Sequence, residues 1–241
     1  MKQLRINGPE NSPLIFRMVM SGVCVALVLS GCISAANSPT PRFYGLQAVE
    51  EGKVQPVRGC DFNSPGSASG GAGKKINIAS GTLIGVGPVK IPEYQNRPQI
   101  VTRDKEGMLK FAQFDRWGES LDLGMARLIE TELSAMFPEG RFALYPWDPS
   151  ITVKYQVAVE IVQLDSELDK DMFLVAQWLV IDAKNRETVV IRRSEFKLPV
   201  IPRNYSGLAK TLSTACASLS GEIAEALDVL ETKDDAAVSG K

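Results

Sequence analysis

ITVKYQVAVEI, residues 151–161, alternates apolar side chains with polar or small ones. A period of two places every second side chain on the same face of a β-strand. One face can then be buried while the other faces water, which is typical of a strand in an antiparallel sheet. The stretch therefore predicts a strand with one face against a core.

Two more strands are predicted directly after this one. Residues 172–181 (MFLVAQWLVI) are apolar on both faces, which indicates a strand in the middle of a sheet. Residues 182–187 form a predicted turn, and residues 188–198 return as a more polar strand. Together the three strands form a predicted antiparallel meander.

Two amphipathic helices are predicted, one before and one after the meander. Residues 120–137 and about 206–231 carry apolar side chains at spacings of three and four, which make one apolar stripe on each helix. Pro138 and Gly140 end the first helix. We expect the stripe of the second helix to pack on the sheet, and the alternative is a coiled coil with a partner helix.

The remaining segments complete a single domain over residues 42–231. Weaker strand patterns cover residues 42–47, 76–89, 109–114 and 141–145. The fold class is therefore α+β, with a mainly antiparallel sheet and two principal helices packed on it. A Gly/Ser-rich insert at about residues 59–75 reads as a loop, and residues 232–241 form a polar tail.

The N-terminus has the pattern of an export signal. Lys2, Arg5 and Arg17 supply basic charge, and the apolar stretch that follows, residues 18–29, is too short to span a bilayer. A lipoprotein signal peptide is predicted over residues 1–31.

The end of this signal resembles the bacterial lipobox. It reads Leu-Ser-Gly-Cys at residues 29–32, and the resemblance implies cleavage before Cys32 and acylation of that cysteine. Acyl chains contribute about 0.8 kcal/mol per buried methylene, so a multiply acylated Cys32 holds a domain on a membrane. Ile33 follows where lipoproteins of the inner membrane commonly carry Asp, which implies the outer membrane. Residues 32–41 then form a lipidated tether, and the alternative is an ordinary cleaved signal peptide.

Composition excludes several classes of function. The chain of 241 residues has 27 basic and 28 acidic residues, a balance that does not favour nucleic-acid binding. It contains no histidine, which rules out Ser/His/Asp and Cys/His catalysis and metal sites that need an imidazole. We therefore predict no catalytic residue, no metal and no cofactor.

Two cysteines remain for the exported domain. Cys60 and Cys216 could form a disulfide in an oxidising periplasm. Cys60 lies beside the insert, and Cys216 lies at the edge of the apolar stripe of the last predicted helix. The alternative is that Cys216 is a free, small apolar residue of the core.

Four further segments carry a family resemblance. They are RFYGL at 42–46, GVGPVKIPEYQNRPQIV at 85–101, FDRWGESL at 114–121 and YPW at 145–147. With the lipobox, they resemble the ABC-type transport auxiliary lipoproteins, and among these the PqiC group. The resemblance covers nearly all of residues 42–231 except the insert.

The resemblance implies a place in the cell envelope and a set of partners. It implies a non-enzymatic lipoprotein on the periplasmic face of the outer membrane of a Gram-negative bacterium, anchored in the lipid through Cys32. It further implies a PqiB-like protein with mammalian-cell-entry (MCE) domains and a PqiA-like inner-membrane protein as partners. The implied task is to dock this lipid transport system to the outer membrane and to support membrane integrity. A ring of copies of this chain fits a ring-shaped MCE partner.

One loop has the composition of a contact surface. Tyr94, Asn96, Arg97 and Pro98 combine a fixed backbone with residue types that are favoured at interface hot spots. These four residues are the predicted partner-binding site. The alternative is that the loop packs on the edge of the domain.

Two other functions stay open. A hydrolase of envelope polymers would need a pair of carboxylates that face each other, and a stand-alone lipid-binding lipoprotein would need an enclosed apolar pocket. The tryptophans are expected to be core or helix-entry anchors and not ligand contacts. They are Trp117, Trp147 and Trp178.

Overall fold

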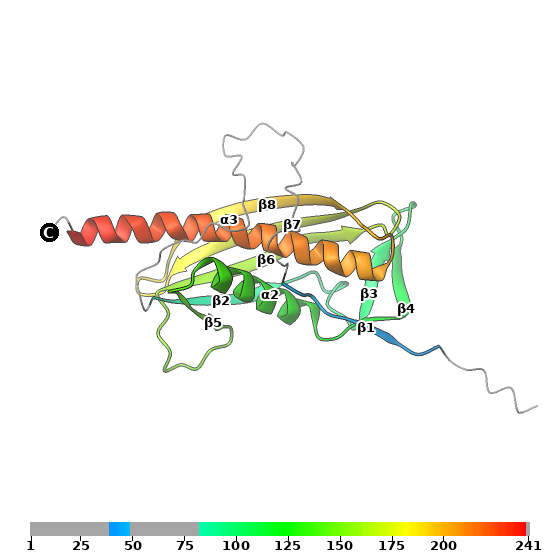
Figure 1. Cartoon of the computed structure of the whole chain (residues 1–241), viewed down its shortest axis with the longest axis horizontal. Coiled ribbons are helices and arrows are strands. Elements are labelled where there is room, and N and C mark those ends of the chain that lie inside the picture. Colours follow the sequence, from blue (N-terminus) through cyan, green and yellow to red (C-terminus); the bar gives the residue numbers. More distant parts are fainter. Residues whose placement is uncertain (1–38, 49–81, 240–241) are drawn as a thin grey trace, which may run out of the picture. The chain divides into compact units, whose positions relative to one another are not determined.

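The computed structural model describes residues 39–48 and 82–239, with side chains up to residue 234. Its strands are β1 (Arg42–Tyr44), β2 (Leu83–Lys90), β3 (Gln99–Arg103), β4 (Leu109–Trp117), β5 (Arg141–Leu144), β6 (Tyr155–Ser166), β7 (Asp171–Asp182) and β8 (Glu187–Pro199). Its helices are α2 (Leu121–Met136) and α3 (Tyr205–Ser239). All of these elements belong to one unit that begins at Pro41 (Figure 1). The predicted single α+β domain with two principal helices is confirmed.

The strands form two sheets. The larger sheet has the order β5-β2-β6-β7-β8, and the smaller sheet has the order β1-β4-β3. The meander of β6, β7 and β8 is antiparallel, as its sequence pattern indicates. Strand β2, however, pairs in parallel with both β5 and β6, and β1 pairs in parallel with β4. Both sheets are therefore mixed.

The core lies between one face of the larger sheet and the two helices (Figure 1). Met172, Leu174 and Trp178 of β7 are fully buried on this face. Their spacing of two or four residues keeps them on one side of the strand. Helices α2 and α3 contact each other and both reach the sheet, so the stripe of α3 packs within the domain, as we expected.

The three tryptophans differ in their surroundings. Trp117 and Trp178 are buried in the core. Trp147 is only half-buried and stands edge-on to the ring of Tyr145, with ring centroids 5.5 Å apart. A Cβ at Gly85 of β2 would lie 2.5 Å from the Trp147 ring, so the glycine makes room for this ring.

Strand β6 starts later than its pattern predicts. The alternation begins at Ile151, whereas the strand begins at Tyr155. Ile151 is 39% exposed, and its N–H donates to the carbonyl of Asp148 at 2.9 Å. The Asp148 side chain also accepts from the N–H of Ser150 at 2.8 Å. This turn competes with the sheet for the backbone, so the strand cannot form there.

Helix α3 continues beyond the predicted end at residue 231. Its apolar stripe ends at Leu230, but the next polar residues have partners on β6 and just before it. Lys154 Nζ lies 2.9 Å from both Glu231 Oε1 and Asp234 Oδ2, and Tyr155 donates to Asp234 at 2.8 Å. Part of the predicted polar tail is therefore helical and bonded to the domain. Among the described residues, neither helix is both long enough and apolar enough to cross a bilayer.

A polar cluster joins β7, β8 and α3 inside the domain. Trp178 Nε1 donates to Ser194 Oγ at 2.9 Å, and the Ser194 hydroxyl donates to the carboxylate of Glu222. Burial raises the pKa of Glu222, although the Ser194 hydroxyl and the charge of Arg192 both oppose this shift. The cluster satisfies the buried indole N–H through a carboxyl group that is itself partly desolvated.

Two glycines of α3 provide a matched test of packing. A Cβ at Gly207 would lie 1.7 Å from the carbonyl oxygen of Pro202, whereas no described atom lies within 4 Å of a Cβ at Gly221. We expect Gly207→Ala to lower the free energy of unfolding by about 2–3 kcal/mol through overpacking. Gly221→Ala should raise it by about 0.5–1 kcal/mol, because alanine favours helix. Denaturant unfolding measures both, and equal effects would contradict the close approach of Gly207 to Pro202.

The polar cluster predicts a pH effect. A raised pKa means that the folded state binds this proton more tightly than the unfolded state, so stability is lost as the pH rises through the pKa of Glu222. Glu222→Gln keeps an acceptor for Ser194 and removes the charge. We expect the variant to have a higher Tm than wild type near pH 7 and a similar Tm near pH 4. Thermal unfolding at both pH values checks this, with Glu187→Gln at an exposed site as the control.

Candidate functional site

Three side chains from separate parts of the chain meet at the end of β6. Tyr94 belongs to the loop between β2 and β3, Arg103 ends β3, and Asp165 lies near the end of β6. Arg103 Nε lies 2.5 Å from Asp165 Oδ1, and the Tyr94 hydroxyl donates to the same oxygen at 3.3 Å. The guanidinium carbon of Arg103 also stands 5.7 Å from the centre of the Tyr94 ring. One aspartate thus joins the loop to two strands.

Two glutamines hold this arrangement in place. Gln163 Nε2 donates to the second carboxylate oxygen of Asp165 at 2.8 Å. Gln95, which is only 3% exposed, donates to the carbonyl oxygen of Leu164 at 2.6 Å. A buried amide with such a partner fixes the loop against β6. The sequence pattern carries no sign of this role for Gln95, because it depends on a contact between residues far apart in the chain.

The electrostatics of the cluster are those of a structural ion pair. The hydrogen bond to Asp165 raises the pKa of Arg103 further above its ordinary value. Burial and the charge of Asp165 raise the pKa of Tyr94. Both side chains therefore stay protonated at neutral pH, and neither is prepared to act as a base.

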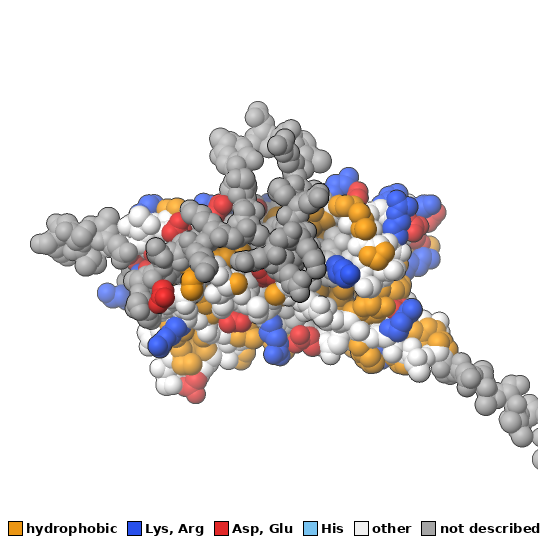
Figure 2. Space-filling view, viewed as in Figure 1, with side chains coloured by type: hydrophobic (Ala, Val, Ile, Leu, Met, Phe, Trp, Pro, Cys, Tyr) orange, Lys and Arg blue, Asp and Glu red, His pale blue; other side chains and the backbone are white. Residues whose placement is uncertain are grey.

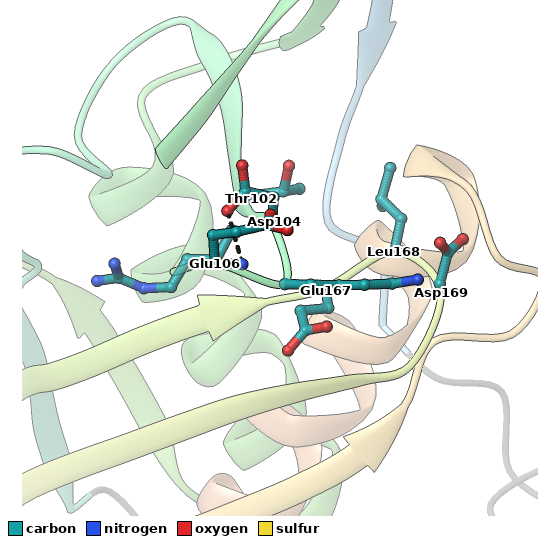
Figure 3. Close-up of a pocket in the computed structure, with 8 residues that line it drawn as sticks. Thr102, Asp104, Glu106, Glu167, Leu168 and Asp169 are labelled. Carbon is teal, nitrogen blue, oxygen red and sulfur yellow. Dashed lines mark hydrogen bonds between the residues drawn. The ribbon is translucent and has the colours of Figure 1, made fainter. Parts of the chain in front are cut away.

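Two open cavities lie beside the cluster, between the β3–β4 turn and the β6–β7 turn. We call them the charged grooves. The first has a volume of about 350 Å³ and is lined by Arg103, Asp104, Glu167 and their neighbours (Figure 3). The second, of about 310 Å³, shares these three residues and extends to Lys170. Acidic and basic side chains are mixed along both grooves, so the surface suits a polar partner of mixed charge.

Asp104 shapes the turn that borders both grooves. Its carboxylate accepts from the N–H of Met108 at 2.8 Å and of Glu106 at 3.1 Å, and Lys110 Nζ lies 3.2 Å away. Burial acts to raise the pKa of Asp104, but these donors outweigh it and hold the pKa below its ordinary value. The carboxylate is thus bound within the turn as an anion.

The sequence of this domain matches the model of a known protein family. The model of the ABC-type transport auxiliary lipoprotein component matches residues 67–224. The chain belongs to this family. The resemblance inferred from the sequence is confirmed, and the match covers most of the described domain together with part of the Gly/Ser-rich insert.

Solved structures share the fold of this auxiliary lipoprotein. An uncharacterized protein with 15% identity has a TM-score of 0.55, and the match covers 78% of this chain and 99% of that chain. Protein XCC0632 from Xanthomonas campestris has 11% identity and a TM-score of 0.54, with 67% and 90% coverage. No curated protein matches the chain in sequence. At these identities the likeness to the solved structures shows the fold alone.

The predicted partner-binding loop is divided between two environments. Tyr94 is half-buried in the cluster with Asp165. Asn96, Arg97 and Pro98 are exposed, although Asn96 Nδ2 donates to Asp122 at 3.4 Å and the Pro98 carbonyl accepts from the N–H of Trp117 at 2.8 Å. The backbone of the loop packs on the domain edge, and contact with a partner stays a prediction for its exposed side chains.

Two of the three cysteines in our predictions, Cys32 and Cys60, lie outside the described residues. Cys216 is fully buried in the core and has no disulfide partner among the described residues, and burial raises the pKa of its thiol to about 12. A disulfide with Cys60 stays a prediction. Within the described part of the chain, no group of three or more candidate side chains could hold a metal ion.

The Asp165 cluster predicts a local stability effect. Asp165→Asn weakens the charged hydrogen bond to Arg103 and leaves the guanidinium without its counter-ion. We expect a loss of about 1–2 kcal/mol, since the Asp165 side chain is only 18% exposed and also accepts hydrogen bonds from Tyr94 and Gln163. Glu195→Gln is a matched control, because its ion pair with Arg193 is exposed and should contribute less than about 0.5 kcal/mol. Urea unfolding midpoints compare the two, and equal losses would contradict the role of Asp165.

Proposed function

We propose that this protein docks an MCE-type, envelope-spanning lipid transport system to the outer membrane and thereby supports membrane integrity. The observation that carries the proposal is the match of residues 67–224 to an auxiliary component of ABC-type transport. An auxiliary component acts through its contacts with other subunits. The proposed partners are a PqiB-like MCE protein and a PqiA-like inner-membrane protein.

The anchor in this proposal is Cys32. Membership in a lipoprotein family supports acylation of the lipobox cysteine. The acyl chains would hold the domain on the periplasmic face of the outer membrane, and the tether would join them to β1 at Arg42.

The proposed docking surface is formed by the charged grooves. Arg103, Lys105 and Lys170 place positive charge there, next to Glu167 and Asp169. Complementary charge on a partner would select it and fix its orientation. The ion pair of Arg103 with Asp165 holds the two turns at a set distance, so the surface is prepared before binding. A ring of copies would repeat this surface around a ring-shaped partner.

The two other candidate functions have less support. A lipid carrier needs a closed apolar pocket, whereas the charged grooves are open and are lined mostly by charged residues. A hydrolase with two carboxylates needs one with a raised pKa as its acid. The pKa of Asp104 in the grooves is lowered, and Glu222, whose pKa is raised, lies outside the grooves in the cluster with Ser194. The non-enzymatic docking role therefore remains the proposal.

Charge reversal in the grooves tests the docking surface. We expect Lys105→Glu with Lys170→Glu to reduce crosslinking to the MCE protein in intact cells about tenfold, because the partner's complementary charges are then repelled. Lys184→Glu with Lys210→Glu is the matched control, since it reverses the same number of charges at exposed sites in the turn after β7 and on α3. Affinity purification with mass spectrometry identifies and quantifies the crosslinked partner.

The anchor is tested in the same cells with Cys32→Ala. Membrane fractionation should find wild type in the outer membrane and the variant released from it. If wild type lies in the outer membrane but is not crosslinked to an MCE protein, the docking function is contradicted and the lipid anchor is supported. Equal crosslinking of the groove and control variants would contradict only the location of the docking surface.

A further inference from the structure

The outer face of the small sheet carries two exposed aromatic rings. Phe43 of β1 is 66% exposed, and Phe111 of β4 is 49% exposed. Two exposed phenylalanines on one small sheet mark a candidate contact surface. In Figure 2, hydrophobic, basic and acidic side chains lie next to one another at the end of the domain that carries β3 and β4.

Strand pairing links both rings through β3. Phe43 pairs with Arg116, and Arg116 pairs with Gln99 on β3. Phe111 pairs with Val101, two residues along β3 from Gln99. The ladder between β3 and β4 shifts register between Gln99 and Val101, and Val101 itself is only 2% exposed. The exposed fractions of Phe43 and Phe111 show that both rings point away from the core.

Two arginines lie beside these rings. The guanidinium carbon of Arg97 stands 4.7 Å from the centre of the Phe111 ring, and Arg116 lies across from Phe43. The neighbouring carboxylate of Asp115 has a side chain only 6% exposed and is paired with Arg42 at 2.8 Å. We call Phe43, Phe111, Arg97 and Arg116 the aromatic face.

The length of the tether limits how far this face can lie from the membrane. Ten peptide units separate Cys32 from Arg42 at the start of β1, and a fully extended chain spans at most about 3.6 Å per residue. Residue 42 therefore lies within about 36 Å of the acylated cysteine. Phe43 is the next residue along the chain, so it lies within about 40 Å of the acylated cysteine.

We propose that the aromatic face rests on the phospholipid surface into which the acyl chains of Cys32 insert. Phenylalanine is one of the residues that membrane-surface proteins bury at the boundary between headgroups and acyl chains, and arginine binds phosphate oxygens in a bidentate manner. A second membrane contact strengthens a lipid anchor and also restricts rotation of the domain about its tether. The inference rests on the proposed acylation of Cys32, and it assigns Arg97 to lipid and not to a protein partner.

Photo-crosslinking in vesicles tests the proposal on the full acylated protein. Benzoylphenylalanine is placed at position 43 or at position 111, and the protein, purified from membranes, is reconstituted in vesicles of phosphatidylethanolamine and phosphatidylglycerol. Position 191 is the matched control, because Ile191 on β8 is 65% exposed. We expect severalfold more lipid adducts at 43 and 111 than at 191, as measured by mass spectrometry. Equal adducts at the three positions would overturn the proposal.

A second arm uses the same variants in intact cells. Adducts of positions 43 and 111 with lipid support the aromatic face as a membrane contact. Adducts with another protein, or with a second copy of this chain, overturn it in favour of a protein interface. Arg97→Gln with Arg116→Gln should reduce the lipid adducts severalfold in the vesicles, while thermal unfolding confirms that each variant is folded.

The mass of the mature N-terminal peptide separates this proposal from the proposed function. If Cys32 carries no acyl chain, the anchor fails and the aromatic face loses its basis. If Cys32 is acylated and positions 43 and 111 give no lipid adducts, only the aromatic face is contradicted. Docking through the charged grooves is then unaffected.

Discussion

The fold depends on burying one face of the central strands β6 and β7 beneath two helices. Trp178 supplies the largest fully buried side chain of this face, and its indole N–H needs a partner because an unsatisfied buried donor is costly. Ser194 on β8 accepts that hydrogen bond, and its own hydroxyl donates a hydrogen bond to the carboxylate of Glu222 on α3. A single aromatic residue thus sets both the edge strand β8 and the position of the long helix. The remaining strands are added around this centre.

The sequence predicted the elements whose pattern is local. The alternation around Val157 and Val159 indicated the meander, and the stripes of three and four indicated both helices, because side-chain periodicity reports burial directly. Strand direction has no such local signal, so the parallel pairing of β2 with β5 and β6 could not be predicted. The extension of α3 was missed for a similar reason. Glu231 and Asp234 are polar and look solvated in sequence, but Lys154 and Tyr155 bind them from the start of β6.

The candidate site depends even more on contacts between residues far apart in the chain, which the sequence pattern does not reveal. Composition marked the loop around Tyr94 and Arg97 as a contact surface, and the structure divides it. Tyr94 faces inward to Asp165, a residue 71 positions further along the chain, whereas Arg97 faces outward over Phe111. Residue type alone cannot tell these environments apart, because tyrosine and arginine serve equally in buried networks and at interfaces. The charged grooves were not predicted, since turns from two separate hairpins form them.

The β3–β4 hairpin links the two proposed surfaces. The aromatic face lies along its strands, while its turn, shaped by Asp104, borders the charged grooves. Arg103 near that turn is bound to Asp165, which fixes the hairpin to the end of β6. A membrane contact through Phe111 would therefore set the orientation of the grooves with little freedom between them, because a short hairpin with packed side chains is stiff. A flexible tether alone would leave the grooves pointing in many directions. The tether and the hairpin together would present the grooves to a partner in one direction.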